Sequence, residues 1–225
     1  MQDVNYRFQF DDGSAASFGV APVGTAGDLP SWTALGFHQC PNCPLSVAAV
    51  PRCPMAASFV PLVSAFGARL SYEPVTVHVE SRDRIVTKTT TVQAAVGSLM
   101  GLLAATSGCP RMDFLKPMAH FHLPFASEDE TIYRVASMYL LAQYFVCRSG
   151  AEPDWQLGKL KANYQELQQV NAAMAARLRE VSERDGTLNA LVLLDLLAKA
   201  LPYSIDDMLE DVRPAFESRQ DKEIE

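Results

Sequence analysis

Four of the five cysteines in this chain are followed directly by proline, as Cys40-Pro41, Cys43-Pro44, Cys53-Pro54 and Cys109-Pro110. With 14 prolines in 225 residues, proline would follow a given cysteine by chance roughly one time in sixteen. Proline fixes its own φ and restricts the preceding residue to extended conformations, so each of these thiols lies in a stiff, non-helical segment. Thiolates held in this way can converge on a metal with little ordering cost. We therefore predict one metal site formed by Cys40, Cys43, Cys53 and Cys109.

The spacing of these cysteines is compatible with two kinds of metal centre. Cys40 and Cys43 are separated by two residues, and pairs at this spacing share one centre in zinc and iron–sulfur proteins. Cys53 follows after nine further residues, and Cys109 must come from elsewhere in the fold. Structural zinc sites often use two close pairs, whereas one pair with two remote cysteines, each followed by proline, resembles [4Fe-4S] ligation. The predicted cofactor is an iron–sulfur cluster or zinc, in a structural, sensory or electron-transfer role.

Two other uses of the cysteines remain open. The run Cys40-Pro41-Asn42-Cys43 resembles the Cys-Pro-x-Cys motif of glutaredoxins. That resemblance implies a thiol–disulfide oxidoreductase in which Cys40 is a low-pKa nucleophile at a helix start, after a strand over 32–37. The third hypothesis is a non-catalytic protein-interaction module with buried free thiols, because free cysteine is commonly a small buried hydrophobe. Cys147 stands apart from the four, and we predict that it is a structural core cysteine.

Three histidines are further candidates for metal or partner binding. His38 lies two residues before Cys40 and would supply or replace a ligand, or else hydrogen-bond within its loop. His120 and His122 flank Phe121, and an extended segment would place both imidazoles on one face. That face would suit a metal or an acidic partner, although a partly exposed strand explains the pattern equally simply.

Composition and charge exclude several classes of function. The net charge is −7 and the sequence pI is about 5.1, which argues against general affinity for nucleic acid or an anionic membrane. The first residues lack the basic and apolar regions of a signal peptide, so we expect a cytoplasmic protein with reduced thiols. The most apolar stretch, 92–106, is shorter than the ~20 residues of a membrane span. No catalytic triad, Walker loop or dinucleotide-binding fingerprint appears, so the sequence indicates no class of enzyme.

The hydrophobic pattern predicts an α+β fold with a change of character near residue 126. Alternation over 6–10 and 15–20, and again over 75–80 and 85–90, predicts two antiparallel hairpins with proline-rich loops between them. Helices are expected over 55–70 and 92–106. We therefore distinguish a cysteine-bearing region, 1–126, from a helical region, 127–225, and the two could form one continuous domain.

The helical region begins with a capping box in which Ser127 is the N-cap and Glu130 the third helical residue. Apolar residues at three- and four-residue steps then predict one long amphipathic helix over 157–181. A further apolar helix is expected over 187–201, and a last one, capped by Ser204, ends near Pro214. The long helix and its neighbour would pack together or offer a face to a protein partner. The sequence does not specify the oligomeric state.

Overall fold

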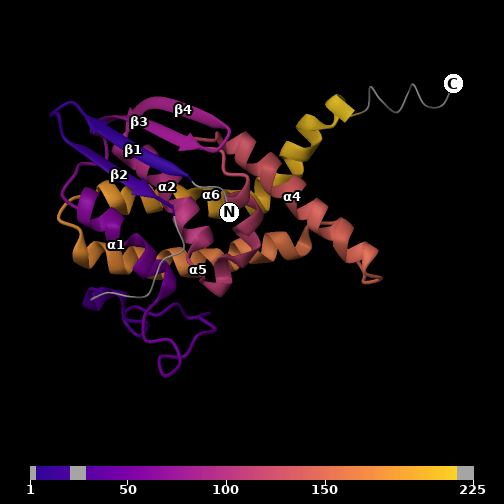
Figure 1. The fold of residues 1–225 in the computed structure, drawn as a ribbon. Coiled ribbons are helices and arrows are strands. Elements are labelled where there is room, and N and C mark those ends of the chain that lie inside the picture. Colours follow the sequence, from indigo (N-terminus) through magenta and orange to yellow (C-terminus); the bar gives the residue numbers. More distant parts are fainter. Residues whose placement is uncertain (1–3, 21–28, 217–225) are drawn as a thin grey trace.

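The computed structural model of the chain describes residues 4–20 and 29–216. Its N-terminal part contains a four-stranded antiparallel sheet of order β2-β1-β3-β4 (Figure 1). The strands are β1 (Asn5–Phe10), β2 (Ala15–Gly19), β3 (Pro74–Ser81) and β4 (Arg84–Thr91). Both hairpins predicted from the sequence are therefore confirmed, and the fold is α+β.

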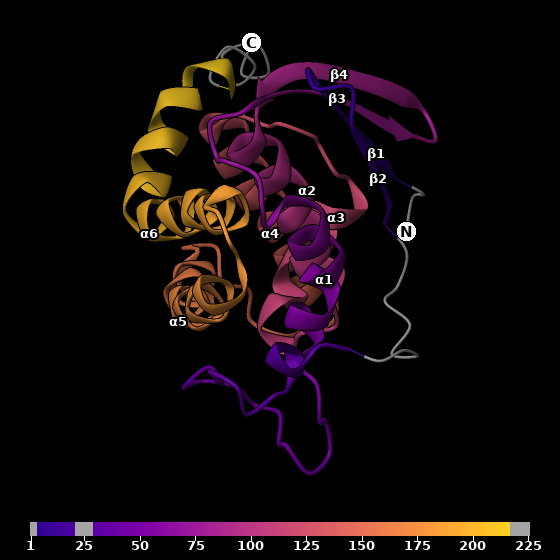
Figure 2. The same cartoon turned by 90° about the vertical axis from the view of Figure 1, so that its left-hand side faces the viewer.

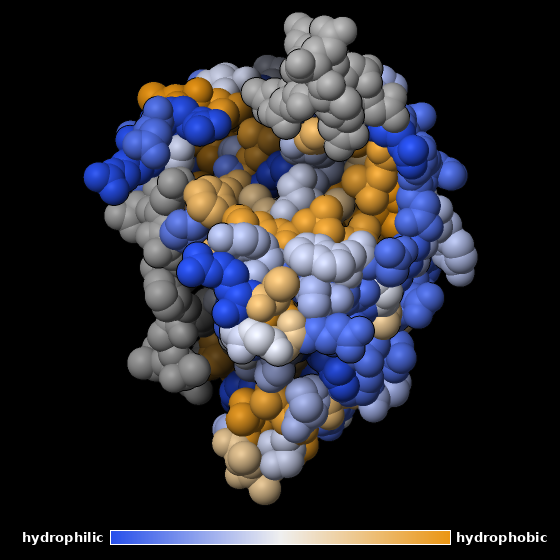
Figure 3. All heavy atoms as spheres, turned by 90° about the vertical axis from the view of Figure 1, so that its right-hand side faces the viewer, coloured by the Kyte–Doolittle hydropathy of each residue, from blue (hydrophilic) through white to orange (hydrophobic). Residues whose placement is uncertain are grey.

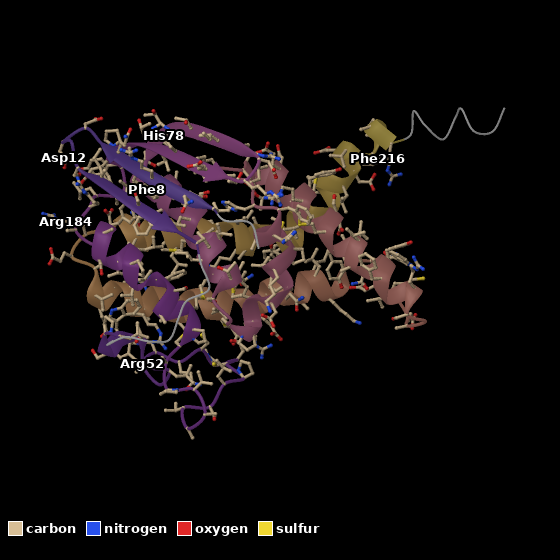
Figure 4. All side chains as sticks on the ribbon, viewed as in Figure 1. Phe8, Asp12, Arg52, His78, Arg184 and Phe216 are labelled. Carbon is tan, nitrogen blue, oxygen red and sulfur yellow. The ribbon has the colours of Figure 1, made fainter. Side chains whose placement is uncertain are left out.

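Alternation of side chains gives the sheet one buried face and one outer face. Tyr6 and Phe8 of β1 are buried opposite Val79 and Val77 of β3. His78 lies between these valines and hydrogen-bonds to Thr87 and Gln9 of the flanking strands, on the outer face. Figure 4 labels Phe8 and His78 on the two neighbouring strands. One face of the sheet is thus apolar and packs on helices, as the two-residue period predicts.

The helices form the rest of the molecule beneath the buried face of the sheet (Figures 1 and 2). The longer ones are α1 (Pro54–Phe66), α2 (Val92–Thr106), α4 (Glu128–Arg148), α5 (Gly158–Val181) and α6 (Gly186–Val212). A short helical turn, η1 (Ser31–Thr33), precedes α1. Two more, η2 (Pro110–Leu115) and α3 (Lys116–His120), follow α2. The capping box at Ser127 and Glu130 is formed as predicted. A single hydrophobic cluster includes residues of both predicted regions, so the sheet, α2, α5 and α6 share one core.

The C-terminal helices differ from the prediction at one point. Two helices were expected, one ending near Leu201 and one capped by Ser204, but α6 is continuous through Pro202. Proline cannot donate to the carbonyl four residues earlier, and the Ala198 carbonyl instead accepts from Gln168 Nε2 of α5 at 3.4 Å. Ser204 donates to the Ala200 carbonyl and does not cap a helix. The helix bends along its length, which Figure 2 shows.

The segment 186–216 is long and apolar enough to cross a membrane by length and composition alone. Core helices that pack inside a protein meet the same test, and α6 makes extensive contacts with α2 and α5. Ala190, Leu191, Leu201 and Ile205 are fully buried in these contacts. The segment therefore does not by itself indicate a membrane.

Two glycines that begin long helices provide a matched test of the packing. A Cβ on Gly186 would lie 2.8 Å from the Arg69 carbonyl oxygen, whereas a Cβ on Gly158 would meet nothing closer than 3.7 Å. We expect Gly186→Ala to lower the free energy of unfolding by about 2 kcal/mol, because backbone must move to relieve the clash. Gly158→Ala should be neutral or stabilise by about 0.5 kcal/mol. Urea denaturation of both variants measures the difference, and equal stabilities would contradict this packing of α6.

Candidate metal centre

The loop that carries three of the cysteines is closed at its base by a short antiparallel bridge. Ala34 pairs with Arg52, the Leu35 amide donates to the Pro51 carbonyl at 2.9 Å, and the Cys53 amide donates to the Thr33 carbonyl at 2.7 Å. The loop extends from the rest of the molecule at the lower end of Figure 1, and Figure 4 labels Arg52 at its base. The bridge thereby brings Cys53 back beside the segment that leads into Cys40.

Cys40 and Cys43 are the two ends of one β-turn. The Cys43 amide donates to the Cys40 carbonyl at 3.0 Å. Pro41 occupies the second position of this turn, where its fixed φ is favourable. Both thiols are half-buried and pack against the core. The turn thus holds the two cysteines close together with little freedom.

Cys53 and Cys109 have nearly the same backbone conformation although they are far apart in the sequence. Their φ and ψ angles are −67° and 118° for Cys53, and −68° and 121° for Cys109. Each is the N-cap of a helical segment whose first residue is proline, α1 for Pro54 and η2 for Pro110. Proline suits a first helical position and keeps the preceding residue extended. This is the local geometry that the four Cys-Pro pairs predict.

The structure brings all four predicted cysteines to one place. Cys40, Cys43, Cys53 and Cys109 line a single small cavity of about 10 Å³ between the loop, η2 and α5. Among the residues that the structure describes, however, no three His, Cys, Asp or Glu side chains are close enough together to hold one metal ion. All five cysteines are free thiols. The four thiols therefore surround a common space without closing on a single point.

Burial and mutual repulsion disfavour thiolates in this cavity. Burial, together with the neighbouring thiols Cys53, Cys43 and Cys109, raises the pKa of Cys40 to about 11. Burial also raises the pKa of Cys109. A glutaredoxin-like nucleophile requires the opposite shift. Its structural context is missing as well, because 32–37 contains a 3₁₀ turn rather than a strand, and no helix starts at Cys40.

Arg177 of α5 supplies a buried positive charge to the same cavity. Its side chain is 1% exposed and lines the cavity wall beside the cysteines. The guanidinium donates to the carbonyl oxygens of Trp32, Ala34 and Leu35 at 2.6, 2.8 and 3.0 Å. Within the described ranges 4–20 and 29–216, no carboxylate pairs with it. A buried charge without a counterion is costly, so the site would be stabilised by an anionic partner.

A second arginine connects the loop to η2. Arg111 Nε donates to the Asn42 carbonyl at 2.8 Å, and its guanidinium also pairs with Glu166 of α5. Asn42 Nδ2 donates to the Glu166 carbonyl at 3.0 Å. Because Asn42 lies inside the Cys40–Cys43 turn and Arg111 lies two residues after Cys109, these bonds fix the two cysteine segments against each other.

The structure places the remaining candidate residues elsewhere. His38 pairs with Glu180 and does not line the cavity. His120 is the last residue of α3 and His122 follows the helix, so the prediction of an extended segment with both imidazoles on one face is wrong. Cys147 is exposed at the end of α4 and is not the core cysteine that we predicted.

The sequence analysis missed Arg177, although its position carries a signal. The apolar stripe of the predicted long helix includes Met174, Leu178 and Val181, and Arg177 lies on that stripe. An arginine among core positions of an amphipathic helix indicates a buried charge that must be compensated. The cysteine side chains that share the cavity with Arg177 lie too far away in the sequence for this pattern to point to them.

Comparisons with known proteins identify a family but no function. A family model described as "Domain of unknown function (DUF6901)" matches residues 4–217, nearly the whole chain. No curated protein and no solved structure matches this chain.

Removing the Arg177 guanidinium tests how much it contributes to the loop. We expect Arg177→Met to lower the free energy of unfolding by about 3 kcal/mol, because three buried carbonyls lose a charged donor. Arg179→Met is the matched control, since Arg179 is exposed two residues further along α5. Chemical denaturation of both variants measures the difference. An Arg177→Met protein as stable as the control would show that the guanidinium does not fix the loop.

Proposed function

We propose that this chain, which belongs to the DUF6901 family, is an iron–sulfur protein. In this proposal Cys40, Cys43, Cys53 and Cys109 hold one [4Fe-4S] cluster. The observation that carries the proposal is the shared cavity, in which four thiols face a buried arginine that has no carboxylate partner among the described residues. Four thiolates outweigh the positive charge of a zinc ion or a cluster core, so the occupied site is a net anion. Arg177 compensates that charge.

A metal that binds here must displace protons from the thiols. The pKa of Cys40 is raised by burial and by neighbouring thiols, so the metal-free site favours protonated sulfur. A metal centre withdraws charge from thiolates and displaces their protons. Binding would thereby convert neutral thiols into thiolates held by one positive centre.

Both a cluster and a single zinc ion would require the four thiols to move from their positions around the cavity. The cavity has a volume of about 10 Å³, roughly the room that a sphere of ~1.4 Å radius needs. Sulfur atoms that touch such a sphere stand farther from its centre than the ~2.3 Å of a Zn–S bond. A cluster gives each thiolate its own iron, but four irons and four sulfides need more room than this cavity has, so the loop that carries Cys40 and Cys43 would have to move outward. The choice of a cluster over zinc therefore rests on the sequence pattern of one close cysteine pair and two remote cysteines, each followed by proline.

The position of the site suits electron transfer or redox sensing. Cys40 and Cys43 are half-buried beside an exposed loop, whereas Cys53 and Cys109 are buried. A cluster held there would lie close to solvent on one side and to the core on the other. Solvent exposure, nearby charge and hydrogen bonds to sulfur set the reduction potential of such clusters. The positive charges of Arg177 and Arg111 would raise the reduction potential of the cluster.

Metal analysis of the cysteine variants tests the proposal directly. For protein purified without oxygen, we expect ~four irons and as many sulfides per chain, with broad visible absorbance. Serine at Cys40, Cys43, Cys53 or Cys109 should remove most of the iron, because each thiolate ligates one iron. Cys147→Ser is the matched control and should keep the full content, since Cys147 is exposed and distant from the cavity.

Three outcomes would overturn the proposal in different ways. One zinc per chain, lost in the same four variants, would establish a structural zinc site. Iron that is retained in all four variants would place the cluster elsewhere. Metal-free protein that remains folded, judged by circular dichroism, would leave an interaction module with buried free thiols. Because Cys53 and Cys109 are buried N-caps, the Cys40 and Cys43 variants decide the result if the other two fail to fold.

A further inference from the structure

A second and much larger cavity lies on the opposite side of η2, between α2, α6 and the end of the sheet. Its volume is about 380 Å³, within the range of small-molecule binding sites. Figure 3 shows a hollow bordered by hydrophobic side chains on the side of the molecule that lies to the right in Figure 1. Most of the lining is apolar, with leucines of α6 such as Leu193, Leu194 and Leu197 on one wall.

The cavity exists because α2 presents small residues to it. The lining residues of this helix include Ala94, Gly97, Ser98, Gly101 and Ala105, which recur at three- and four-residue steps. Such residues share one face of a helix. Larger side chains at these positions would fill the space between α2 and α6. This face of α2 therefore borders a hollow along part of its length.

One end of the cavity is polar and pre-organised. Tyr6 Oη is hydrogen-bonded to Ser98 Oγ at 2.8 Å and to His122 Nε2 at 2.5 Å. The Phe125 amide donates to Ser98 Oγ at 3.1 Å, and Phe125 has a left-handed φ of 59°. A non-glycine residue in this region is strained by about 1 kcal/mol or more, and such strain concentrates at ligand sites. These bonds fix Ser98, His122 and Phe125 at the cavity wall.

The charged residues at this end are all cationic. Lys88 Nζ lies 5.8 Å from the centre of the Phe125 ring, and Arg134 donates to the Met118 and Phe121 carbonyls. Both side chains line the cavity, and no aspartate or glutamate among residues 4–20 and 29–216 does. Neither forms a salt bridge with any residue in the described parts of the chain. Burial lowers the pKa of His122 to about 4, so this imidazole is neutral at physiological pH.

We propose that this cavity binds a small amphipathic anion, with its apolar chain between α2 and α6 and its head group beside Lys88 and Arg134. A medium-chain carboxylate is the simplest member of this class. The inference rests on charge complementarity: in a chain of net charge −7, two cations and no carboxylate of the described residues line an apolar hollow, and Glu130, which acts electrostatically on Arg134, does not line it. A neutral apolar ligand would leave those cations unused, and a cationic amphiphile would be repelled by them.

Calorimetric titration with dodecanoate, below the concentration at which it aggregates, tests the proposal. Dodecanoate should bind with one site per chain, and dodecyltrimethylammonium, with the same chain and the opposite charge, should bind at least tenfold more weakly. Lys88→Gln should weaken dodecanoate binding by about three- to fivefold, as expected for an exposed cation. Arg84→Gln is the matched control, because Arg84 is exposed on the same strand and does not line the cavity.

Filling the cavity provides a second variant. Gly101→Leu should abolish binding, because a Cβ at Gly101 would meet only Leu194 Cδ2 at 3.6 Å and the rest of the side chain enters the hollow. No dodecanoate binding, equal binding of the two amphiphiles, or unchanged binding in Gly101→Leu would each overturn the proposal. If Gly101→Leu fails to fold, the proposal is still tested by the comparison of dodecanoate with dodecyltrimethylammonium and by the Lys88→Gln variant. The Cys40→Ser protein should bind dodecanoate normally, which separates this site from the metal centre.

Discussion

A single buried guanidinium determines how the loop with the cysteines sits on the helices. Arg177 donates to the carbonyls of Trp32, Ala34 and Leu35, and this segment also pairs with residues 51–53. A loop of this length without regular structure would otherwise leave its backbone groups without partners near the core. The arginine satisfies them and so aligns the base of the loop with α5. Cys40, Cys43 and Cys53 are then positioned from that base, and Cys109 meets them from η2.

The general architecture followed from the sequence because it depends on local patterns. The period-two runs at 6–10 and 75–80 predicted buried sheet faces, and the capping box at Ser127 marked the start of α4. The predicted helix end at residue 201 was wrong because α6 continues through Pro202. The carbonyl that it leaves without a donor accepts from Gln168 of α5, a tertiary contact that sequence periodicity cannot show. His122 was misread for a similar reason, since its bond to Tyr6 of β1 turns it toward the core.

The cysteine site was predictable in its local geometry but not in its electrostatics. Proline after cysteine determines the extended backbone at Cys53 and Cys109, and their dihedral angles agree within a few degrees. Convergence of the four thiols was an inference from residue type, and the shared cavity supports it. The compensating charge of Arg177 comes from a helix more than sixty residues after Cys109. Its role depends on packing between α5 and the loop, which no local pattern specifies.

The two cavities are neighbours and share part of their lining. Met55 lines each of them, one residue after the Cys53-Pro54 pair that starts α1. At η2, Cys109 faces the small cavity and Met112 the large one, and the Met112 amide donates to the Cys109 carbonyl at 2.9 Å. A shift of either cysteine segment therefore moves a side chain that lines the apolar cavity. If both sites are occupied, any effect of the metal centre on ligand affinity must equal the effect of the ligand on metal affinity.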